Sequence, residues 1–451
     1  MSQGLIASSE NRVVFGLGAT GLSCARHLHA RGLPFVIVDT REHPPELATL
    51  QAEMPEVPVY AGQWPEDLLS GASELVVSPG IALDSPSVAA ARDAGVQVLG
   101  DIDLFMREAA APVIGITGSN AKSTVTELVG RMAVAAGLNA GVGGNLGTPA
   151  LDLLDPAREV YVLELSSFQL ERAGKLNLAV ATVLNVSADH LDRHGSMPRY
   201  HQAKHRIFQG CGKAVVHRGD PLTVPPQVEG MEIIEWSLGE PDLKGFGLRN
   251  SEGIEYIAHG FELLMPAQDI GLAGRHNLGN ALAALAIGHA AGFPAPAMLQ
   301  ALREFGGLPH RCQPVAEIRG VRYVNDSKGT NVGATIAALA GLGGEGNVVL
   351  IAGGQGKGAD FRELRPAVQR HCRHLLVMGE DAVAIALALD DIVPVERVRD
   401  MPEAVQRAAV LARAGDTVLL SPACASFDMF RGYAARGDAF VAAVNVLGGG
   451  A

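Results

Sequence analysis

The stretch Ile114-Gly115-Ile116-Thr117-Gly118-Ser119-Asn120-Ala121-Lys122-Ser123-Thr124 decides the fold of this chain of 451 residues. Its apolar beginning predicts a buried strand, its glycine-containing middle a tight loop, and the residues from Lys122 onward a helix. Such a loop wraps phosphates with backbone N–H groups, while Lys122 faces the β and γ oxygens and Ser123 offers a hydroxyl to magnesium. We therefore expect a phosphate-binding unit at the edge of a parallel sheet.

This loop departs from the strict phosphate-loop pattern at two positions. Ala121 stands where that pattern has its final glycine, and Ile116 stands where it has its first. If the backbone at position 121 needs a positive φ, an alanine there costs about 1 kcal/mol of strain. Phosphate binding remains the preferred interpretation, and a purely structural turn is the alternative.

Short apolar segments alternate with helical ones along the whole chain, which is typical of α/β folds. Strands are expected at residues 13–15, 35–38, 75–77, 113–116, 161–163, 180–184, 321–324, 348–351, 375–377 and 417–420, and an alanine-rich helix at 278–291. This order predicts three α/β domains, at residues 1–105, 106–307 and 308–451, with limits that are uncertain by several residues.

The composition excludes some classes of function. With 48 acidic and 36 basic side chains the net charge is −12, which disfavours a nucleic-acid surface or an anionic membrane surface. The five cysteines have no paired or metal-type spacing, as expected in a reducing compartment. No apolar run reaches the roughly 18 residues that span a bilayer. We expect a cytoplasmic protein without membrane insertion.

A second glycine-rich turn, Gly16-Leu17-Gly18-Ala19-Thr20-Gly21, lies between a strand and a helix, and Asp39 ends the next strand. Glycines there let the backbone approach a phosphate at a helix N-terminus. Taken alone, this turn allows an NAD-dependent dehydrogenase, a non-catalytic nucleotide-binding protein, or a turn without a ligand. The dehydrogenase interpretation leaves the loop around Lys122 unexplained.

Polar side chains also follow the central strands. Glu164 ends one strand and His190 follows the next, so both reach one edge of the sheet beside the phosphate loop. This placement favours a magnesium site, although a solvated glutamate and a structural histidine are alternatives. Asn277 and Asn280 open a helix, where asparagines either cap the helix or read a purine edge.

Taken together, these segments resemble the Mur ligase family in order and spacing over essentially the whole chain. The matching motifs are residues 117–124, Glu164 to Leu170, Asn185-Val186 with Asp189-His190, His276-Asn277 with Asn280-Ala281, His310-Arg311, Asp326-Ser327-Lys328 and Gly356-Lys357. Residues 16–21, 39–41, 78–80, 143–145 and 421–426 look like the member of the family that adds D-glutamate.

The resemblance implies a Rossmann-like N-terminal domain for a UDP group, a central P-loop-type ATPase with a parallel sheet, and a Rossmann-like C-terminal domain for the amino acid. It implies a monomer that uses ATP to join D-glutamate to UDP-N-acetylmuramoyl-L-alanine through an acyl phosphate. Three ligands on three domains require hinged closure, for which Pro309 and its neighbours are candidates.

The resemblance also implies roles for individual residues. The UDP precursor would contact Ala19, Thr20, Asp39, Thr40, Arg41, Ser78, Pro79, Gly80 and Asn145. ATP would contact Gly118, Ser119, Asn120, Ala121, Lys122, Ser123, Thr124, Asn277, Asn280, Arg311 and Asp326. Two magnesium ions would be held by Ser123, Glu164, His190 and a carbamylated Lys204. Glutamate would lie among Lys328, Thr330, Lys357, Ser426, Phe427 and Tyr433. The catalytic residues would be Lys122, His190 and Lys204.

Overall fold

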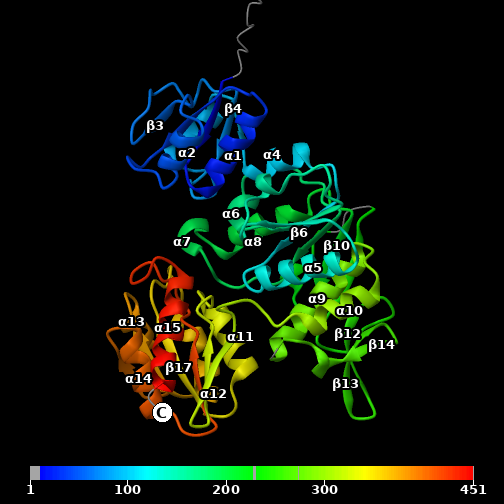
Figure 1. Ribbon diagram of the computed structural model, residues 1–451, viewed down its shortest axis with the longest axis vertical. Coiled ribbons are helices and arrows are strands. Elements are labelled where there is room, and N and C mark those ends of the chain that lie inside the picture. Colours follow the sequence, from blue (N-terminus) through cyan, green and yellow to red (C-terminus); the bar gives the residue numbers. More distant parts are fainter. Residues whose placement is uncertain (1–10, 227–229, 273, 450–451) are drawn as a thin grey trace, which may run out of the picture.

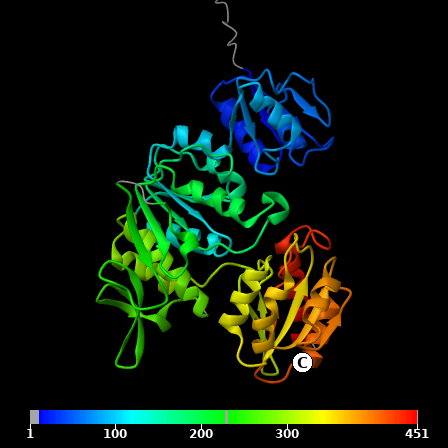
Figure 2. The same ribbon diagram turned by 180° about the vertical axis from the view of Figure 1, so that it is seen from behind.

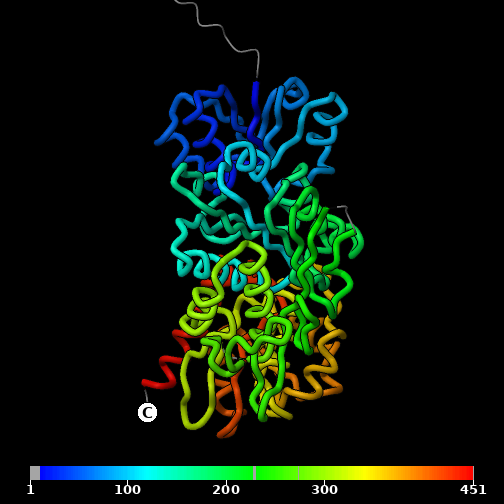
Figure 3. Tube along the Cα trace, turned by 90° about the vertical axis from the view of Figure 1, so that its right-hand side faces the viewer, coloured from blue at the N-terminus to red at the C-terminus, as the bar shows by residue number. Residues whose placement is uncertain are grey.

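A computed structural model describes residues 11–226, 230–272 and 274–449 of the protein. Three sheets follow one another along the chain, and each is covered by helices of its own (Figure 1). We call the parts built on them the N-terminal, central and C-terminal domains. The N-terminal domain lies at one end of the molecule, and the C-terminal domain lies toward the other end, beside the far half of the central domain (Figures 2 and 3).

The N-terminal domain has a five-stranded parallel sheet in the order β3-β2-β1-β4-β5. Its strands are β1 (Arg12–Phe15), β2 (Phe35–Asp39), β3 (Val59–Ala61), β4 (Glu74–Val77) and β5 (Gln97–Leu99). Its helices are α1 (Ala19–Ala30), α2 (Leu47–Glu53) and α3 (Pro86–Asp93). The glycine-rich turn joins β1 to α1 and therefore lies at the carboxyl edge of this sheet.

Helix α4 (Asp101–Glu108) links the N-terminal and central domains. The Phe105 ring lies edge-on to the Tyr161 ring at 5.0 Å between centroids, so α4 packs on the central domain. The helix runs across the limit at residues 105/106 that the sequence suggested. A helical pattern gives no sign of which neighbour it will cover, because that depends on tertiary packing.

The central domain has a nine-stranded sheet in the order β14-β13-β12-β11-β10-β9-β6-β8-β7. Its strands are β6 (Val113–Thr117), β7 (Ala140–Gly144), β8 (Val160–Glu164), β9 (Val180–Val183), β10 (Lys213–His217), β11 (Glu232–Trp236), β12 (Phe246–Ser251), β13 (Ile254–His259) and β14 (Glu262–Pro266). The pairs from β7 to β12 are parallel, as expected, whereas β12, β13 and β14 form an antiparallel meander that was not expected.

Alternate residues of the central strands face two different cores, as the period of two in a strand requires. Val160 and Val162 pack with α5 (Lys122–Ala135), α9 (Arg275–Ala290) and α10 (Ala295–Glu304). Tyr161 and Leu163 face the other side, which carries α6 (Ser167–Leu170), α7 (Leu191–His194) and α8 (Met197–His205). The sheet is therefore buried on both faces, and its carboxyl edge remains for ligands.

The C-terminal domain has a six-stranded sheet in the order β15-β16-β20-β17-β18-β19, with only β15 antiparallel. Its strands are β15 (Gln313–Ile318), β16 (Val321–Asn325), β17 (Val348–Gly353), β18 (Cys372–Met378), β19 (Val395–Arg397) and β20 (Thr417–Leu420). Its helices are α11 (Val332–Leu342), α12 (Arg365–His371), α13 (Ala382–Leu389), α14 (Met401–Leu411) and α15 (Tyr433–Gly448). Among the described residues, no helix is both long and apolar enough to cross a membrane.

Candidate active site

The phosphate loop leaves β6 and enters α5 at Lys122, as expected. Ala121 has a φ of 65°, so this position does require the left-handed backbone that favours glycine. The loop is braced by the residue after β9: the backbone N–H of Ser119 donates to the Asn185 carbonyl at 3.0 Å, and that of Asn120 donates to Asn185 Oδ1 at 2.8 Å. The neighbouring strand thus holds the loop in shape.

Two lysine side chains donate hydrogen bonds to the same backbone carbonyl of this loop. Lys122 Nζ and Lys204 Nζ both donate to the Gly118 carbonyl, at 2.9 and 2.8 Å. Lys204 lies on helix α8 and is only 1% exposed. Its Nζ lies 4.4 Å from the centroid of the Tyr200 ring. Burial, and then the charge of Lys122, hold the pKa of Lys204 well below its ordinary value. Both effects shift Lys204 toward the neutral amine.

Glu164 ends β8 and points its carboxylate toward Lys122. Burial acts to raise the pKa of Glu164, but Lys122 and hydrogen bonds outweigh it, so the pKa lies below its ordinary value. Asn145 Nδ2 donates to Oε1 at 2.6 Å, whereas Oε2 is buried and has no hydrogen-bond partner among the described residues. An ionised oxygen in that state is costly unless a ligand pairs with it.

His190 follows β9 at the same edge of the sheet. Its ring lies edge-on to the Phe168 ring at 4.8 Å, and burial lowers the pKa of His190 to about 4. The imidazole is therefore neutral at neutral pH, which is the form that binds metals. No group of three or more His, Cys, Asp and Glu side chains among the described residues is placed to hold a metal. A metal here needs other ligands, such as the Ser123 hydroxyl and phosphate oxygens.

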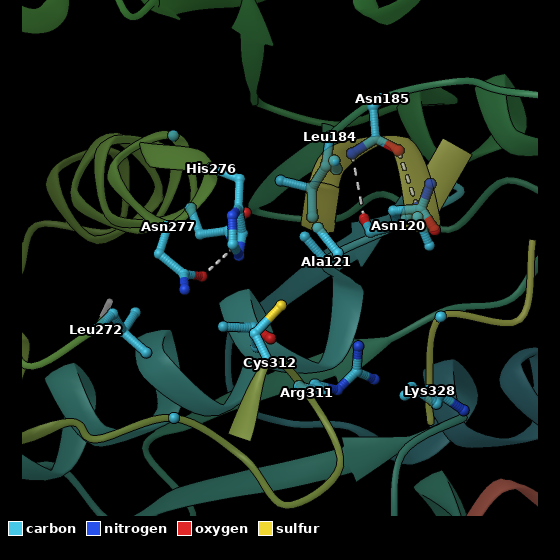
Figure 4. Close-up of a pocket in the computed structure, with 18 of the residues that line it drawn as sticks. Asn120, Ala121, Leu184, Asn185, Leu272, His276, Asn277, Arg311, Cys312 and Lys328 are labelled. Atoms are coloured by element: carbon cyan, nitrogen blue, oxygen red, sulfur yellow. Dashed lines mark hydrogen bonds between the residues drawn. The ribbon is translucent and has the colours of Figure 1, made fainter. Parts of the chain in front are cut away.

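A cavity of about 280 Å³ opens beside the phosphate loop, between the central and C-terminal domains. Asn277 and Leu272 lie toward one end of it, and Arg311 and Lys328 toward the other (Figure 4). Asn280 Nδ2 donates to Asn277 Oδ1 at 2.8 Å. Gly274 is the N-cap of α9, so neither asparagine is the N-cap residue, and both line the cavity.

Two aromatic side chains that the sequence did not single out also line this cavity. His217 ends β10 and Trp236 ends β11, and their rings stack at 4.3 Å with an angle of 15° between the planes. They form an apolar wall suited to a flat base. Neither lies in a glycine-rich or charged motif, so only the parallel pairing of β10 with β11 brings them together.

The connection between the central and C-terminal domains has unusual backbone geometry. Gly307, His310 and Cys312 have φ values of 97°, 61° and 44°. Arg311, between the last two, donates from Nη2 to Ser123 Oγ at 2.6 Å. These left-handed positions surround the predicted hinge at Pro309 and direct Arg311 toward the phosphate loop.

Asp326 also lies at the cavity, but both of its oxygens already accept hydrogen bonds. The backbone N–H of Cys312 donates to Oδ1 at 3.2 Å and Ser421 Oγ donates to Oδ2 at 2.7 Å. Burial raises the pKa of Asp326 to about 6. A ribose would therefore share this carboxylate with two protein donors.

Residues expected to bind glutamate lie near the junction of the two domains, with one exception. Lys357 Nζ donates to Asp189 Oδ1 at 2.5 Å, and Lys328 Nζ lies 3.9 Å from the centroid of the Tyr433 ring. Burial lowers the pKa of Lys328 to about 8. Ser426 is buried, whereas Phe427 is 72% exposed and is not among the residues that line the cavity beside the phosphate loop. Thr330 is half-buried, and its backbone N–H donates to the Lys328 carbonyl at 2.8 Å.

The glycine-rich turn of the N-terminal domain is held by Asp39, which is fully buried. Its carboxylate accepts from the backbone N–H of Leu17 at 2.7 Å and from Arg41 Nη2 at 2.7 Å. A Cβ at Gly21 would lie 1.9 Å from the Gly16 carbonyl, so this glycine is required by close packing. Ala19 and Thr40 are exposed near this turn and Thr20 is half-buried.

Three family models match the chain in sequence order. They are the N-terminal domain of Mur ligases like MurD at residues 10–100, the Mur ligase middle domain at 116–288, and the glutamate ligase domain of Mur ligases at 310–424. Together they span most of the chain, and each falls on a different sheet.

Known proteins are similar over the full length. UDP-N-acetylmuramoylalanine–D-glutamate ligase of Pseudomonas putida is 56% identical over 99% of this chain and 100% of its own length. The ligase of the same name from Hahella chejuensis is 51% identical over 98% of this chain and 100% of its own.

Solved structures share the fold at low identity. The MurC structure of Thermotoga maritima has a TM-score of 0.59 and 18% identity, covering 97% of this chain and 99% of its own. A MurF structure of Acinetobacter baumannii has a TM-score of 0.58 and 17% identity, covering 92% and 89%. The chain belongs to the Mur ligase family.

Proposed function

We propose that this chain is the ligase that joins D-glutamate to UDP-N-acetylmuramoyl-L-alanine at the expense of ATP. One observation carries the proposal: relatives that bear this activity in their names are 56% identical over nearly all of both chains. The site fits a reaction that uses ATP, because a phosphate loop and a cavity of the size of a nucleobase lie at one domain junction. Three basic side chains lie there as well: Lys122, Arg311 and Lys328. The dehydrogenase and the non-catalytic binder leave the middle and glutamate-ligase matches unexplained.

The reaction has two steps. A carboxylate oxygen of the alanyl group attacks the γ-phosphorus of ATP, the bond from that phosphorus to its bridging oxygen breaks, and ADP leaves. The amine of glutamate then attacks the acyl carbon, phosphate leaves with the bonding electron pair, and the nitrogen loses a proton. We infer that Lys122 and Arg311 stabilise the transferring phosphoryl group, because both side chains donate to residues of the phosphate loop.

The residues at the sheet edge fit magnesium. The buried Oε2 of Glu164 has no hydrogen-bond partner in the part of the chain that the structure describes, and the imidazole of His190 is neutral. Ser123 belongs to the phosphate loop, where its hydroxyl accepts from Arg311. Magnesium, when bound, neutralises charge on the phosphate oxygens. We infer that Glu164 and Ser123 hold one ion and that His190 contributes to a second.

Lys204 is proposed to carry a carbamate. Two ammonium groups donating to one carbonyl would repel each other in a buried site, and burial favours the neutral amine of Lys204. The neutral nitrogen attacks the carbon of CO₂ and loses a proton. The product is an anion with two hard oxygens, which balances Lys122 and suits magnesium.

The three ligands are assigned to three domains, with residues 1–105 for the UDP group, 106–307 for ATP and 308–451 for glutamate. Asn277 and Asn280 would contact adenine between the His217–Trp236 wall and the phosphate loop. Lys328, Thr330, Lys357 and Tyr433 would approach the glutamate carboxylates. We also infer a cytoplasmic monomer, which fits the five free cysteines.

The proposal is tested by incubating the protein with ATP, magnesium, UDP-N-acetylmuramoyl-L-alanine and either enantiomer of glutamate. A product with the mass of the precursor plus one glutamyl residue is expected with D-glutamate only. The Lys122→Ala variant should give none while still binding the precursor in calorimetry. Product from L-glutamate alone, or none from either enantiomer, would overturn the proposal.

A further inference from the structure

Arg172 comes from the central domain and reaches into the N-terminal domain. Its fully buried side chain donates from Nη1 to the carbonyls of Val77 and Ser78, at 3.1 and 2.5 Å. It donates from Nη2 to the carbonyls of Pro79 and Ile81, at 3.2 and 3.1 Å. One guanidinium thus donates hydrogen bonds to four carbonyls at the end of β4 and in the turn that follows it.

The chain is shaped to admit this side chain. A Cβ at Gly100 would lie 2.8 Å from Arg172 Cγ, so only a glycine lets the arginine pass. Glu171 Oε1 accepts from Arg172 Nη2 at 2.9 Å and so balances the buried charge. None of the motifs noted in the sequence includes Arg172.

The turn that Arg172 holds is a β-turn, because the Ile81 N–H donates to the Ser78 carbonyl at 3.0 Å. Proline and glycine at its two central positions favour a type II turn, in which the glycine needs a φ near +80°. Gly80 does not adopt a positive φ of that kind. The turn therefore departs from the type that its own sequence favours.

Type I and type II turns differ by a flip of the peptide between the two central residues. The bond from Arg172 to the Pro79 carbonyl fixes that peptide with its oxygen toward the central domain. In a trans peptide the N–H points opposite to the C=O, so the Gly80 N–H is turned away from Arg172. Gly80 is exposed to solvent.

We propose that Arg172 is a positioning residue for the UDP precursor: it prevents the flip of the Pro79–Gly80 peptide and so presents an N–H group, instead of a carbonyl, to the diphosphate. This inference rests on the proposed function, in which Ser78 to Gly80 faces the diphosphate. A flipped peptide would direct a carbonyl oxygen at an anion, which is repulsive.

The test compares Arg172→Lys with the wild type by calorimetry, using UDP and uridine as probes. Lysine keeps the charge but cannot reach four carbonyls at once. We expect UDP to bind about tenfold more weakly, and uridine to bind as in the wild type. Arg158→Lys is the matched control, because Arg158 donates to Asn139 Oδ1 and to the Ala140 carbonyl within the central domain. It should change neither affinity.

A second variant separates peptide orientation from general damage. Gly80→Ala disfavours a positive φ, and its added Cβ meets nothing within 4 Å. The double variant, Arg172→Lys with Gly80→Ala, should therefore bind UDP nearly as tightly as the Gly80→Ala variant does. Equal losses for UDP and uridine, or no recovery in the double variant, would overturn the inference. Binding of UDP does not require ligation, so failure of the proposed function is detected separately.

Discussion

Lys204 is the residue on which the proposed chemistry depends most. We predict that Lys204→Ala lowers kcat by about a hundredfold or more, because an anion beside Lys122 and the metal is lost. Lys204→Glu supplies an anionic oxygen on a shorter arm and should be partly active or inactive. The measurements are steady-state rates, thermal unfolding, and carbon NMR of protein in labelled bicarbonate. Lys213→Ala, which removes a lysine that donates to the Ala290 carbonyl, is the control. Wild-type activity in Lys204→Ala would refute the carbamate.

Lys357 is expected to bind glutamate, yet in this structure it is paired with Asp189, whose side chain is 8% exposed. Lys357→Ala should raise the glutamate KM and also lower the free energy of unfolding by about 1–3 kcal/mol, because the buried Asp189 carboxylate loses its charged partner. The carboxylate then keeps only the hydrogen bonds from Asn331 Nδ2 and from the backbone N–H of His190. Adding Asp189→Asn should recover stability but not glutamate affinity. Glutamate KM values equal to that of the wild type would remove Lys357 from the glutamate pocket.

At the scale of the element, the phosphate loop carries a strained alanine. Ala121→Gly should leave the ATP KM unchanged and raise the free energy of unfolding by at most about 1 kcal/mol, because relief of the left-handed strain is partly offset by chain entropy. Ala121→Val places a branched side chain at a φ of 65° and should lower both stability and ATP affinity. Equal unfolding temperatures for the two variants would contradict the strain assigned to this position.

The elements that sequence could predict are those with strong local signals. The apolar runs that became β6, β8 and β17 are continuous and buried, and the loop before Lys122 contains its own turn residues. The antiparallel strands β12 to β14 have mixed exposure and weak alternation, so they gave no clear pattern. The contacts of Arg172 with the turn after β4 and the stacking of His217 on Trp236 join segments distant in sequence, and no spacing rule reveals such partners.

At the scale of the whole molecule, Asn331 joins the C-terminal domain to the phosphate loop. Its Nδ2 donates to Asn120 Oδ1 at 3.0 Å and to Asp189 Oδ2 at 3.1 Å, while its Oδ1 accepts from the Ala334 N–H and caps α11. Serine at this position can still cap the helix but cannot bridge the domains. The contact between the C-terminal and central domains should therefore depend on Asn331 in a way that can be separated from helix stability.

Asn331→Ser is predicted to lower kcat/KM for ATP and for glutamate by about tenfold, with little loss of stability. Asn331→Ala should lose about 1 kcal/mol more. Asp400→Ala is the control: Asp400 caps α14 in the same domain, so stability should fall while rates are kept. Small-angle scattering reports the closure. Unchanged rates and scattering in Asn331→Ser would show that the bridge has no part in catalysis.

The most direct test of the proposed reaction measures whether an oxygen atom of the precursor's carboxylate is transferred to the released phosphate. Ligation is run with UDP-N-acetylmuramoyl-L-alanine in which both oxygens of the terminal carboxylate are a heavy isotope, and the released phosphate is examined by mass spectrometry. If this site activates the carboxylate as an acyl phosphate, each phosphate should carry one labelled oxygen, and release should require ATP, magnesium and D-glutamate together. Phosphate without label, or released equally well without the precursor, would contradict the account.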